Sequence, residues 1–155
     1  MDQLLLISGG QTGVDRAALD AAISAGAPCG GWCPKGRRAE DGPSPERYPL
    51  TEMSGPDYLA RTRKNVDDSD ATLIVTFGPP TGGTRRTVEF CQRLGKPHLI
   101  VDGNALSIAD ATGKVANFVQ EKGVGRLNVA GPRQSGEPRA YGFAFALLTM
   151  LLSKI

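Results

Sequence analysis

Apolar runs of strand length alternate with stretches of helical periodicity along almost the whole chain, and this alternation restricts the fold more than any other feature. It is typical of a doubly wound parallel sheet with right-handed connections. We therefore expect an α/β fold with a mainly parallel sheet of five or six strands, helices on both faces and three αβα layers. The predicted strands are residues 4–8, 28–32, 72–77, 98–101 and 126–130, and the predicted helices are residues 15–25, 56–66, 84–94, 105–122 and 137–154.

The stretch between the second strand and the second helix, residues 33–53, fits neither pattern. It contains Pro34, Pro43, Pro45 and Pro49. Proline has no backbone N–H and interrupts regular hydrogen bonding, so this many prolines argue against a continuous element. We expect a long polar loop here.

The composition indicates one packed domain, residues 1–155, and argues against several classes of partner. Hydrophobic residues make up 40% of the chain and charged residues 22%, which is the balance of a globular protein. The net charge of +2 is too small for nucleic-acid binding through bulk electrostatics. No apolar run approaches the ~20 residues of a membrane span, and the start of the chain lacks the features of a signal peptide. We expect a cytoplasmic protein with neither a nucleic-acid nor a membrane partner.

The cysteines and the histidine give no metal-binding pattern. Cys29 and Cys33 are four residues apart, Cys91 falls within a predicted helix, and His98 is the only histidine. Zinc and redox sites use CxxC spacing, with a second pair of ligands completing a zinc shell. We predict three ordinary thiols and no metal site.

Two turns rich in glycine and threonine each separate a predicted strand from a predicted helix. The first is residues 8–13 and the second is residues 78–84. At such a turn the first N–H groups of the helix lack partners within it and point outward from the positive end of the helix dipole. Glycine lets a ligand approach the backbone, and threonine adds hydroxyl donors. Two such turns in one small domain predict a site for a phosphorylated ligand.

Further candidate residues lie in the other loops at the carboxyl ends of the predicted strands, where open α/β sheets bind their ligands. The loop after the second strand places the aromatic Trp32 near the cations Lys35 and Arg37. Asp102 follows the fourth strand and is a candidate acceptor for a ribose-like hydroxyl. We predict that the ligand-binding residues are Gly9, Gly10, Gln11, Thr12, Gly13, Arg16, Trp32, Lys35, Arg37, Gly78, Thr81, Gly82, Gly83, Thr84, Asp102 and Arg133.

Several of these residues also have a structural interpretation, and the sequence leaves both open. Thr12 and Thr84 precede helices and suit the N-cap position. Lys35 and Arg37 are equally typical of solvated loop charges, and Asp102 of an exposed turn. On the second helix, a solvated face is the expectation for Arg61, Arg63 and Lys64.

Several short motifs, spread over nearly the whole chain, resemble those of one known family. Among them are SGGQTGVDRAALD at residues 8–20, GGWCPKGR at residues 30–37, TGGT at residues 81–84 and NVAGPR at residues 128–133. They are similar to motifs of the molybdenum carrier proteins. The resemblance implies a Rossmann-like domain that forms a homo-oligomer, a dimer or a tetramer. It also implies that the ligand is the molybdenum cofactor, a pterin with a phosphate and a dithiolene-bound metal.

The wider superfamily also contains phosphoribohydrolases, whose motif resembles PGGxGTxxE, with the glutamate assisting cleavage of a glycosidic bond. Here the turn reads PTGGTRRT at residues 80–87, which is one residue shorter and has Thr87 where the glutamate would stand. Glu89 lies two residues further on, about 200° around the helix, so it faces away from that position. If the protein is an enzyme, its carboxylate would come from Glu40, Asp41 or Glu89.

We therefore predict a carrier, without catalysis, for a phosphorylated and ring-containing ligand. The molybdenum cofactor is the first candidate and a nucleotide the second. The two glycine turns would donate N–H groups to the phosphate, Lys35, Arg37 and Arg133 would add positive charge, and Trp32 or Pro79 would cover the ring. The alternatives are a nucleotide N-glycosidase, a nucleotide sensor and a structural subunit without a ligand, in which the glycine turns would have no evident use.

Overall fold

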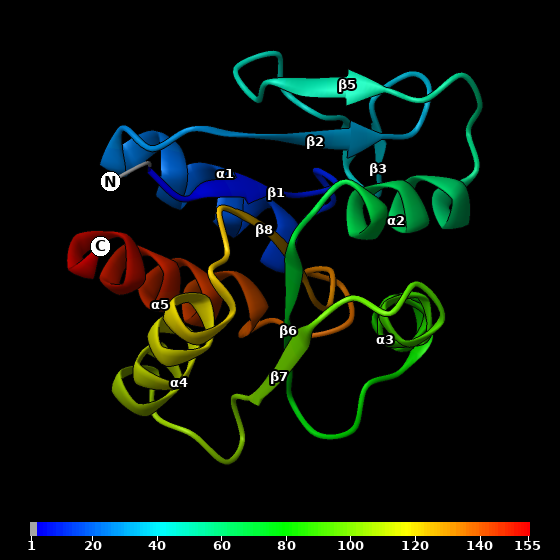
Figure 1. Ribbon diagram of the computed structural model, residues 1–155. Coiled ribbons are helices and arrows are strands. Elements are labelled where there is room, and N and C mark those ends of the chain that lie inside the picture. The colour runs from blue at the N-terminus through cyan, green and yellow to red at the C-terminus, as the bar shows by residue number, and fades with distance from the viewer. Residues whose placement is uncertain (1–2) are drawn as a thin grey trace.

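A parallel sheet forms the centre of the molecule in the computed structural model, which describes residues 3–155. The strands of this sheet are all paired in parallel and lie in the order β5-β2-β1-β8-β6-β7 (Figure 1). The predicted doubly wound α/β fold is thereby confirmed. The strands are β1 (Leu5–Ile7), β2 (Cys29–Cys33), β5 (Leu50–Glu52), β6 (Ala71–Thr76), β7 (His98–Asp102) and β8 (Arg126–Ala130).

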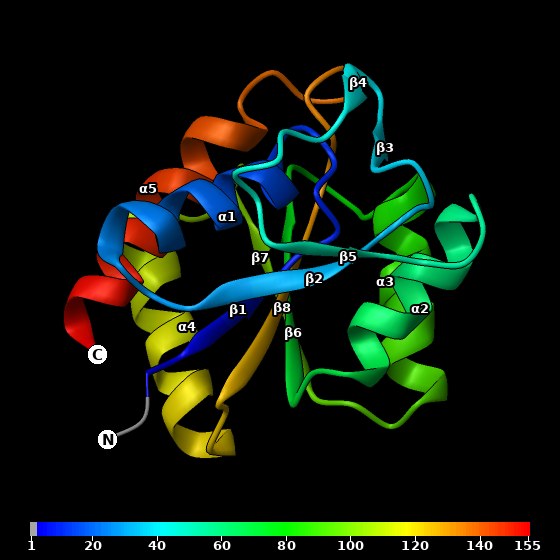
Figure 2. The same cartoon turned by 90° about the horizontal axis from the view of Figure 1, so that it is seen from above.

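Helices cover both faces of the sheet and complete the three layers. One face carries α1, α4 and α5, with α5 packed between the other two, and the opposite face carries α2 and α3 side by side (Figure 2). None of the helices within residues 3–155 is both long and apolar enough to cross a membrane. The helices are α1 (Val14–Ala25), α2 (Tyr58–Asp67), α3 (Gly82–Arg93), α4 (Ile108–Lys122) and α5 (Ala140–Lys154).

The core includes β6, an inner strand of the sheet between β8 and β7. All six residues of this strand are buried, including Leu73, Ile74 and Val75. A strand covered by helices on both faces needs a continuous apolar sequence. The sequence of β6, ATLIVT, is apolar at every position except its two threonines. Burial of this kind fixes the direction and position of β6, and hence of the turn that follows it.

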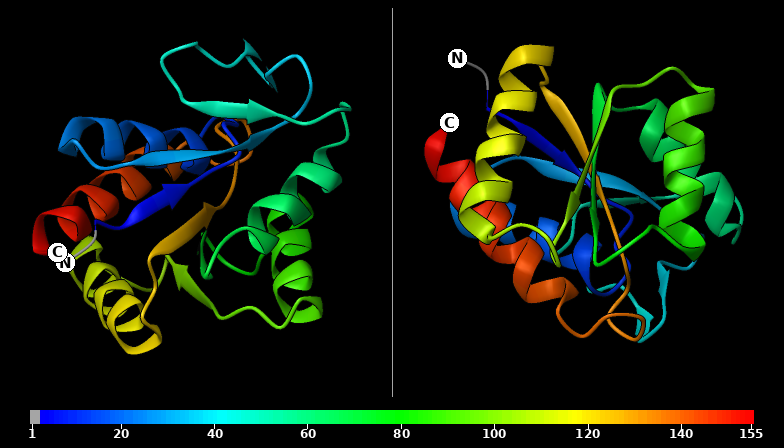
Figure 3. Two further views of the ribbon diagram at one scale, coloured as in Figure 1. Left: turned by 45° about the horizontal axis from the view of Figure 1, so that its top comes forward. Right: turned by 90° about the horizontal axis from the view of Figure 1, so that it is seen from below.

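The prediction of one long loop over residues 33–53 is wrong in part. The segment contains β5, an edge strand that pairs with β2 from Gly31↔Leu50 to Cys33↔Glu52, and a small antiparallel hairpin. This β3–β4 hairpin consists of β3 (Arg38–Ala39) and β4 (Gly42–Pro43). Figure 3 shows it beyond the edge of the sheet, close to the loop that follows β8. Only Pro43 falls within a strand, the two-residue β4, where a missing N–H is tolerated, and Pro34, Pro45 and Pro49 lie between the strands.

All five helices begin at residues different from those predicted. Helix α1 begins one residue early, at Val14, and α2 two residues late, at Tyr58, after its N-cap Asp57. Helix α3 begins at Gly82, two residues early, so the glycines of the second turn form its first turn. Helix α4 begins at Ile108 and not at residue 105, because the Ser107 hydroxyl accepts from the N–H of Asp110 and caps it there. Helix α5 begins at Ala140, three residues late.

Candidate functional site

A cavity of about 560 Å³ opens at the carboxyl ends of β1, β8 and β6, and both glycine turns contribute to its walls. Gly9 and Gln11 line it from the first turn, and the segment from Pro79 to Thr84 lines it from the second. Strands β1 and β6 both flank β8, so their ends are about 10 Å apart, two strand spacings. The two turns therefore share one cavity of the size typical for small-molecule ligands.

The N-terminus of α3 points its free backbone donors into this cavity. Its N-cap, Thr81, makes no capping hydrogen bond through its side chain. Gly82, Gly83 and Thr84 are the first three residues of the helix, so their N–H groups have no carbonyl partner within it. A Cβ atom built on Gly82 or Gly83 would meet no other atom within 4 Å. The space in front of these donors is open, and the helix dipole favours an anion there.

The turn after β1 is different, because its own side chains satisfy most of its N–H groups. The N–H of Gly10 donates to the Ser8 hydroxyl at 3.3 Å, and that of Gln11 to the Asp15 carboxylate at 3.3 Å. The N–H of Thr12 donates to Oε1 of Gln11 at 3.0 Å. Gly10 and Gly13 both have φ of 78°, a conformation that favours glycine. The tight bend is thus present, but α3 offers the freer donors.

Three charged residues of the cavity, Arg61, Asp15 and Glu137, were not predicted from the sequence. The expectation of a solvated Arg61 is wrong: it is only 7% exposed, lines the cavity and donates to the carbonyl of Gly9 at 2.6 Å. Arg63, two residues on, is exposed as expected. The signal that was available is helical spacing, because Arg61 lies four residues before the buried Asn65 and on the same helix face.

Asp15 is the carboxylate in the cavity whose pKa lies closest to neutrality. Burial at the start of α1 raises its pKa to about 6, although Arg61, the Gln11 N–H and Arg16 all act in the opposite direction. Asp15 lines the cavity beside Gly9 and Gln11. A carboxyl group with this pKa exchanges a proton near neutral pH and is therefore suited to acid or base chemistry.

The floor of the cavity also contains a buried hydroxyl that has no protein partner. Oγ1 of Thr76, at the end of β6, makes no hydrogen bond within the described residues, and Thr76 lines the cavity. Buried polar groups nearly always have partners, so such a group at a cavity wall suits a hydrogen bond to water or to a ligand.

Several of the predicted ligand residues lie outside this cavity. Arg37 donates to the carbonyls of Ser44, Pro45, Tyr48 and Leu50 and so fastens the loop on which it lies. The side chain of Lys35 is exposed nearby.

Trp32 and Asp102 also make contacts of their own away from the cavity. The indole Nε1 of Trp32 donates to Asp68 at 2.5 Å, and the ammonium group of Lys64 lies 5.3 Å from the centre of its ring. Asp102 accepts from the N–H groups of Gly78 and Asn104, which hold its pKa below the usual value. Asp102 thus fixes the turn after β6.

The carboxylates considered for catalysis occupy three different places. Glu89 pairs with Arg85 one turn earlier on α3, at 3.8 Å, and does not line the cavity. Asp41 forms two hydrogen bonds with the guanidinium of Arg16. Glu40 reaches the rim of the cavity from the β3–β4 hairpin.

Arg16, Thr12 and Gly13 line a neighbouring hollow, and Arg133 lines the cavity itself.

The cysteines show no arrangement for metal binding in the described part of the chain. Cys29, Cys33 and Cys91 are free, and burial raises the pKa of each thiol. Within residues 3–155, no three His, Cys, Asp or Glu side chains are grouped so that they could hold a metal ion.

Fold and cavity together define a Rossmann-like α/β protein with a ligand-sized pocket at the carboxyl ends of its strands. The model of the circularly permutated YpsA SLOG family matches residues 6–152, and the chain belongs to this family. Among solved structures it is similar to the "Putative molybdenum carrier protein" from Syntrophus aciditrophicus SB, with 46% identity and a TM-score of 0.95 over 97% of this chain and 95% of that one. The resemblance seen in the motifs is thereby confirmed. A search of curated proteins found no match.

Proposed function

We propose that this protein binds and carries a phosphorylated, ring-containing small molecule, with the molybdenum cofactor as the first candidate and a nucleotide as the second. The observation that carries the proposal is the uncapped N-terminus of α3, where Gly82, Gly83 and Thr84 face a cavity of about 560 Å³. The name of the 46% identical relative, a molybdenum carrier protein, favours the molybdenum cofactor over a nucleotide.

In this proposal the phosphate binds at the first turn of α3. The N–H groups of Gly82, Gly83 and Thr84 donate to its oxygens, and the positive end of the helix dipole attracts its charge. The guanidinium groups of Arg61 and Arg133, which both line the cavity, add a longer-range attraction. The ring lies against Pro79 and the exposed aromatic side chain of Tyr58, which line the same cavity.

The residues present fit the phosphate and the ring of a pterin better than they fit direct metal ligation. The open space before Gly83 and the unpartnered hydroxyl of Thr76 suit the oxygens and nitrogens of such a ligand. As cargo, the cofactor brings its metal on its own dithiolene sulfurs. The protein then needs to bind only the organic part of the cofactor.

The proposal is tested by placing a negative charge in the anion site. We expect Gly83→Asp to weaken binding of a phosphorylated ligand by about tenfold to a hundredfold, or ~1.4–2.7 kcal/mol, through repulsion and steric block. Gly83 is helical and has open space around its Cβ position, so the variant should fold. Isothermal titration calorimetry with molybdopterin, or with nucleoside monophosphates, measures the effect.

Gly113→Asp is the matched control, because Gly113 is also a helical glycine with open space around it, but it lies on α4. Equal affinity of the Gly83 variant and the wild type would overturn the anion site. Mass spectrometry and metal analysis of the small molecules released by denaturing the purified protein identify the cargo, which a carrier returns unchanged.

One observation favours a second function, a nucleotide N-glycosidase. The carboxyl group of Asp15 lies in the cavity with a pKa of about 6, which suits a general acid or base better than the lowered pKa values of Glu40 and Asp41. Such an enzyme releases free base from a nucleoside monophosphate. Asp15→Asn would then abolish the release, whereas Glu89→Gln would leave it unchanged. Absence of any free base with the wild-type protein would leave the carrier function.

A further inference from the structure

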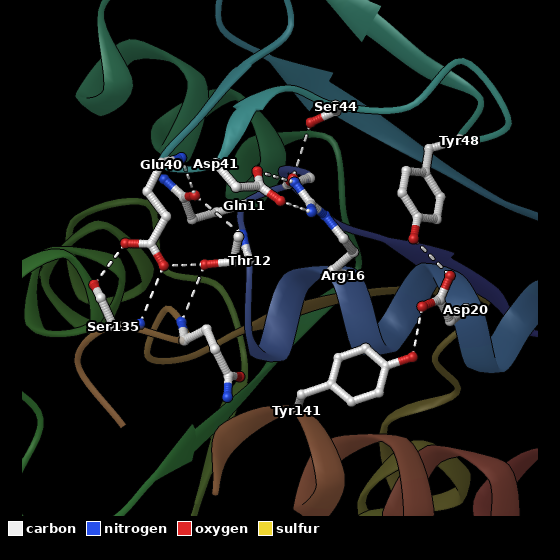
Figure 4. A network of polar contacts seen from close by, with 12 residues as sticks. Gln11, Thr12, Arg16, Asp20, Glu40, Asp41, Ser44, Tyr48, Ser135 and Tyr141 are labelled. Carbon is white, nitrogen blue, oxygen red and sulfur yellow. Dashed lines mark hydrogen bonds and ion pairs between the residues drawn. The ribbon is translucent and has the colours of Figure 1, made fainter. Parts of the chain in front are cut away.

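The β3–β4 hairpin reaches across the gap between the loop after β1 and the loop after β8, and its tip carries two carboxylates (Figure 4). Asp41 forms an ion pair with Arg16, with nitrogen–oxygen distances of 2.5 and 2.9 Å. The N–H of Glu40 donates to Oε1 of Gln11 at 2.8 Å. The tip is thus held by the first turn of the ligand site.

Donors from both loops converge on the carboxylate of Glu40. One oxygen accepts from the hydroxyl of Thr12 and from the N–H of Ser135, the latter at 3.1 Å. The other accepts from the hydroxyl of Ser135 at 2.5 Å and lies 3.7 Å from Nε of Arg133. These hydrogen bonds hold the pKa of Glu40 below its usual range. Proteins bind oxyanions in the same way, with several hydrogen-bond donors and a guanidinium group around the oxygens.

Two further features point to this place as a binding site. A hollow of about 580 Å³ lies beside the carboxylate, lined by Thr12, Arg16, Ser135 and Glu40 itself. In the same hollow, Nε of Arg16 is buried and has no hydrogen-bond partner within the described residues. Since Glu40 also lines the main cavity, it forms the wall between the two spaces.

The backbone lets the tip move while the base of the hairpin stays in place. Arg37 holds the base through its four carbonyl contacts, and the Ser44 hydroxyl donates to the carbonyl of Gly10 at 3.0 Å. Between these anchors only two residue pairs form the ladder, and Gly42 has φ of 109°. The tip is therefore held by its side chains more than by its backbone.

We propose that Glu40 occupies a second anion-binding subsite, built by Thr12, Arg133 and Ser135, as an internal substitute for a tetrahedral oxyanion such as phosphate. A phosphate group displaces the carboxylate, lifts the tip of the hairpin and removes the wall between the two spaces. The subsite rests on the proposed function for its place in the ligand site. Its hydrogen-bond donors, from Thr12 and Ser135, are separate from those of α3, and Arg133 is the one residue that both sites share.

The test is phosphate binding to variants that remove the internal anion. Inorganic phosphate is titrated by calorimetry into the wild type, Glu40→Ala and Glu40→Gln. We expect Glu40→Ala to bind phosphate at least tenfold more tightly than the wild type, with Glu40→Gln between them. Because Glu40 is a surface residue, both variants should fold. Glu46→Gln, an exposed carboxylate further along the same segment, measures the effect of net charge alone.

Two double variants locate the bound phosphate. Adding Thr12→Val to Glu40→Ala should reverse most of the gain, whereas adding Gly83→Asp should leave the gain intact. The inference is overturned if Glu40→Ala binds no more tightly than Glu46→Gln, or if Gly83→Asp removes the gain. Failure of the α3 site shows instead as an unaltered affinity of Gly83→Asp alone, so the two failures are distinguishable.

Titration with a nucleoside monophosphate separates a free oxyanion from a phosphate carried on a larger ligand. If the subsite serves the larger ligand, Glu40→Ala gains affinity for both probes. A gain for inorganic phosphate alone assigns the subsite to a free oxyanion. Amide hydrogen exchange at residues 38–43 of the wild type should become faster on saturation with phosphate, because the tip is released; slower exchange would contradict the displacement of Glu40.

Discussion

At the scale of single residues, two charged groups in the cavity, Arg61 and Asp15, affect each other. Arg61 is buried against the carbonyl of Gly9, and its charge partly offsets the effect of burial on Asp15. Burying an arginine next to a carboxyl group with a raised pKa lowers the stability of the folded protein. Arrangements of this kind are typical of functional sites.

Asp15 gives the protein a measurable pH dependence of stability. Its folded pKa of about 6 lies above the ordinary aspartate value of 3.8, so the folded state binds the proton more tightly than the unfolded state. The free energy of unfolding should therefore fall as the pH rises from about 4 to about 6, by ~1–3 kcal/mol for this group. Asp15→Asn should remove this part of the slope, so the variant gains stability relative to the wild type at pH 7.

Urea denaturation of the wild type and of Asp15→Asn at pH 4, 5, 6 and 7 measures the difference between their free energies of unfolding. The titration of the other groups contributes equally to both proteins and cancels in this difference. Asp110→Asn, at the start of α4, provides a control in a similar helix position far from the cavity. Parallel stability curves for the wild type and Asp15→Asn would show that the pKa of Asp15 is close to its ordinary value.

At the scale of the elements, β6 carries the site and α3 supplies its donors. Strand β6 is buried on both faces and pairs with β7 and β8, so the position of Gly82 and Gly83 depends on its packing. The cavity lies at the ends of β1, β8 and β6, which are inner strands of the described sheet and not edge strands. A rigid support of this kind is needed to hold backbone donors for a ligand.

Truncation within β6 should therefore destabilise the whole fold. Leu73 is fully buried in the main core, so Leu73→Ala should cost about 2–5 kcal/mol, from lost burial and from the cavity left behind. Ile100→Ala on the neighbouring β7 is the control, since Ile100 is 41% exposed and should cost less than about 1 kcal/mol. Equal costs for the two variants, measured by urea denaturation, would show that β6 is not the centre of the core.

At the scale of the whole molecule, residues far apart in the chain come together in space. Gly9, Arg61, Gly83 and Arg133 come from four segments, yet they line one cavity. Family membership and a TM-score of 0.95 to a solved structure support this architecture. The homo-oligomer implied by the resemblance stays a prediction.

Much of the fold follows from local patterns that a sequence shows directly. The apolar run of β6 and the helical spacing of α1 specify their elements through burial, and glycines between strand and helix mark where the turns fall. In parallel sheets these turns meet at one edge, so the shared cavity also follows from the alternation of strands and helices.

Other features arise only when distant segments pack together. Strand β5 exists because β2 offers it a pairing edge, and Arg61 is buried because α2 lies over the end of β1. Glu40 is hydrogen-bonded to Thr12, which is 28 positions away in the chain, and to Ser135, which is 95 positions away. Such contacts depend on distances in space, which hydrophobic periodicity does not encode. The tertiary structure alone therefore decided which charges face the cavity and which fasten the loops.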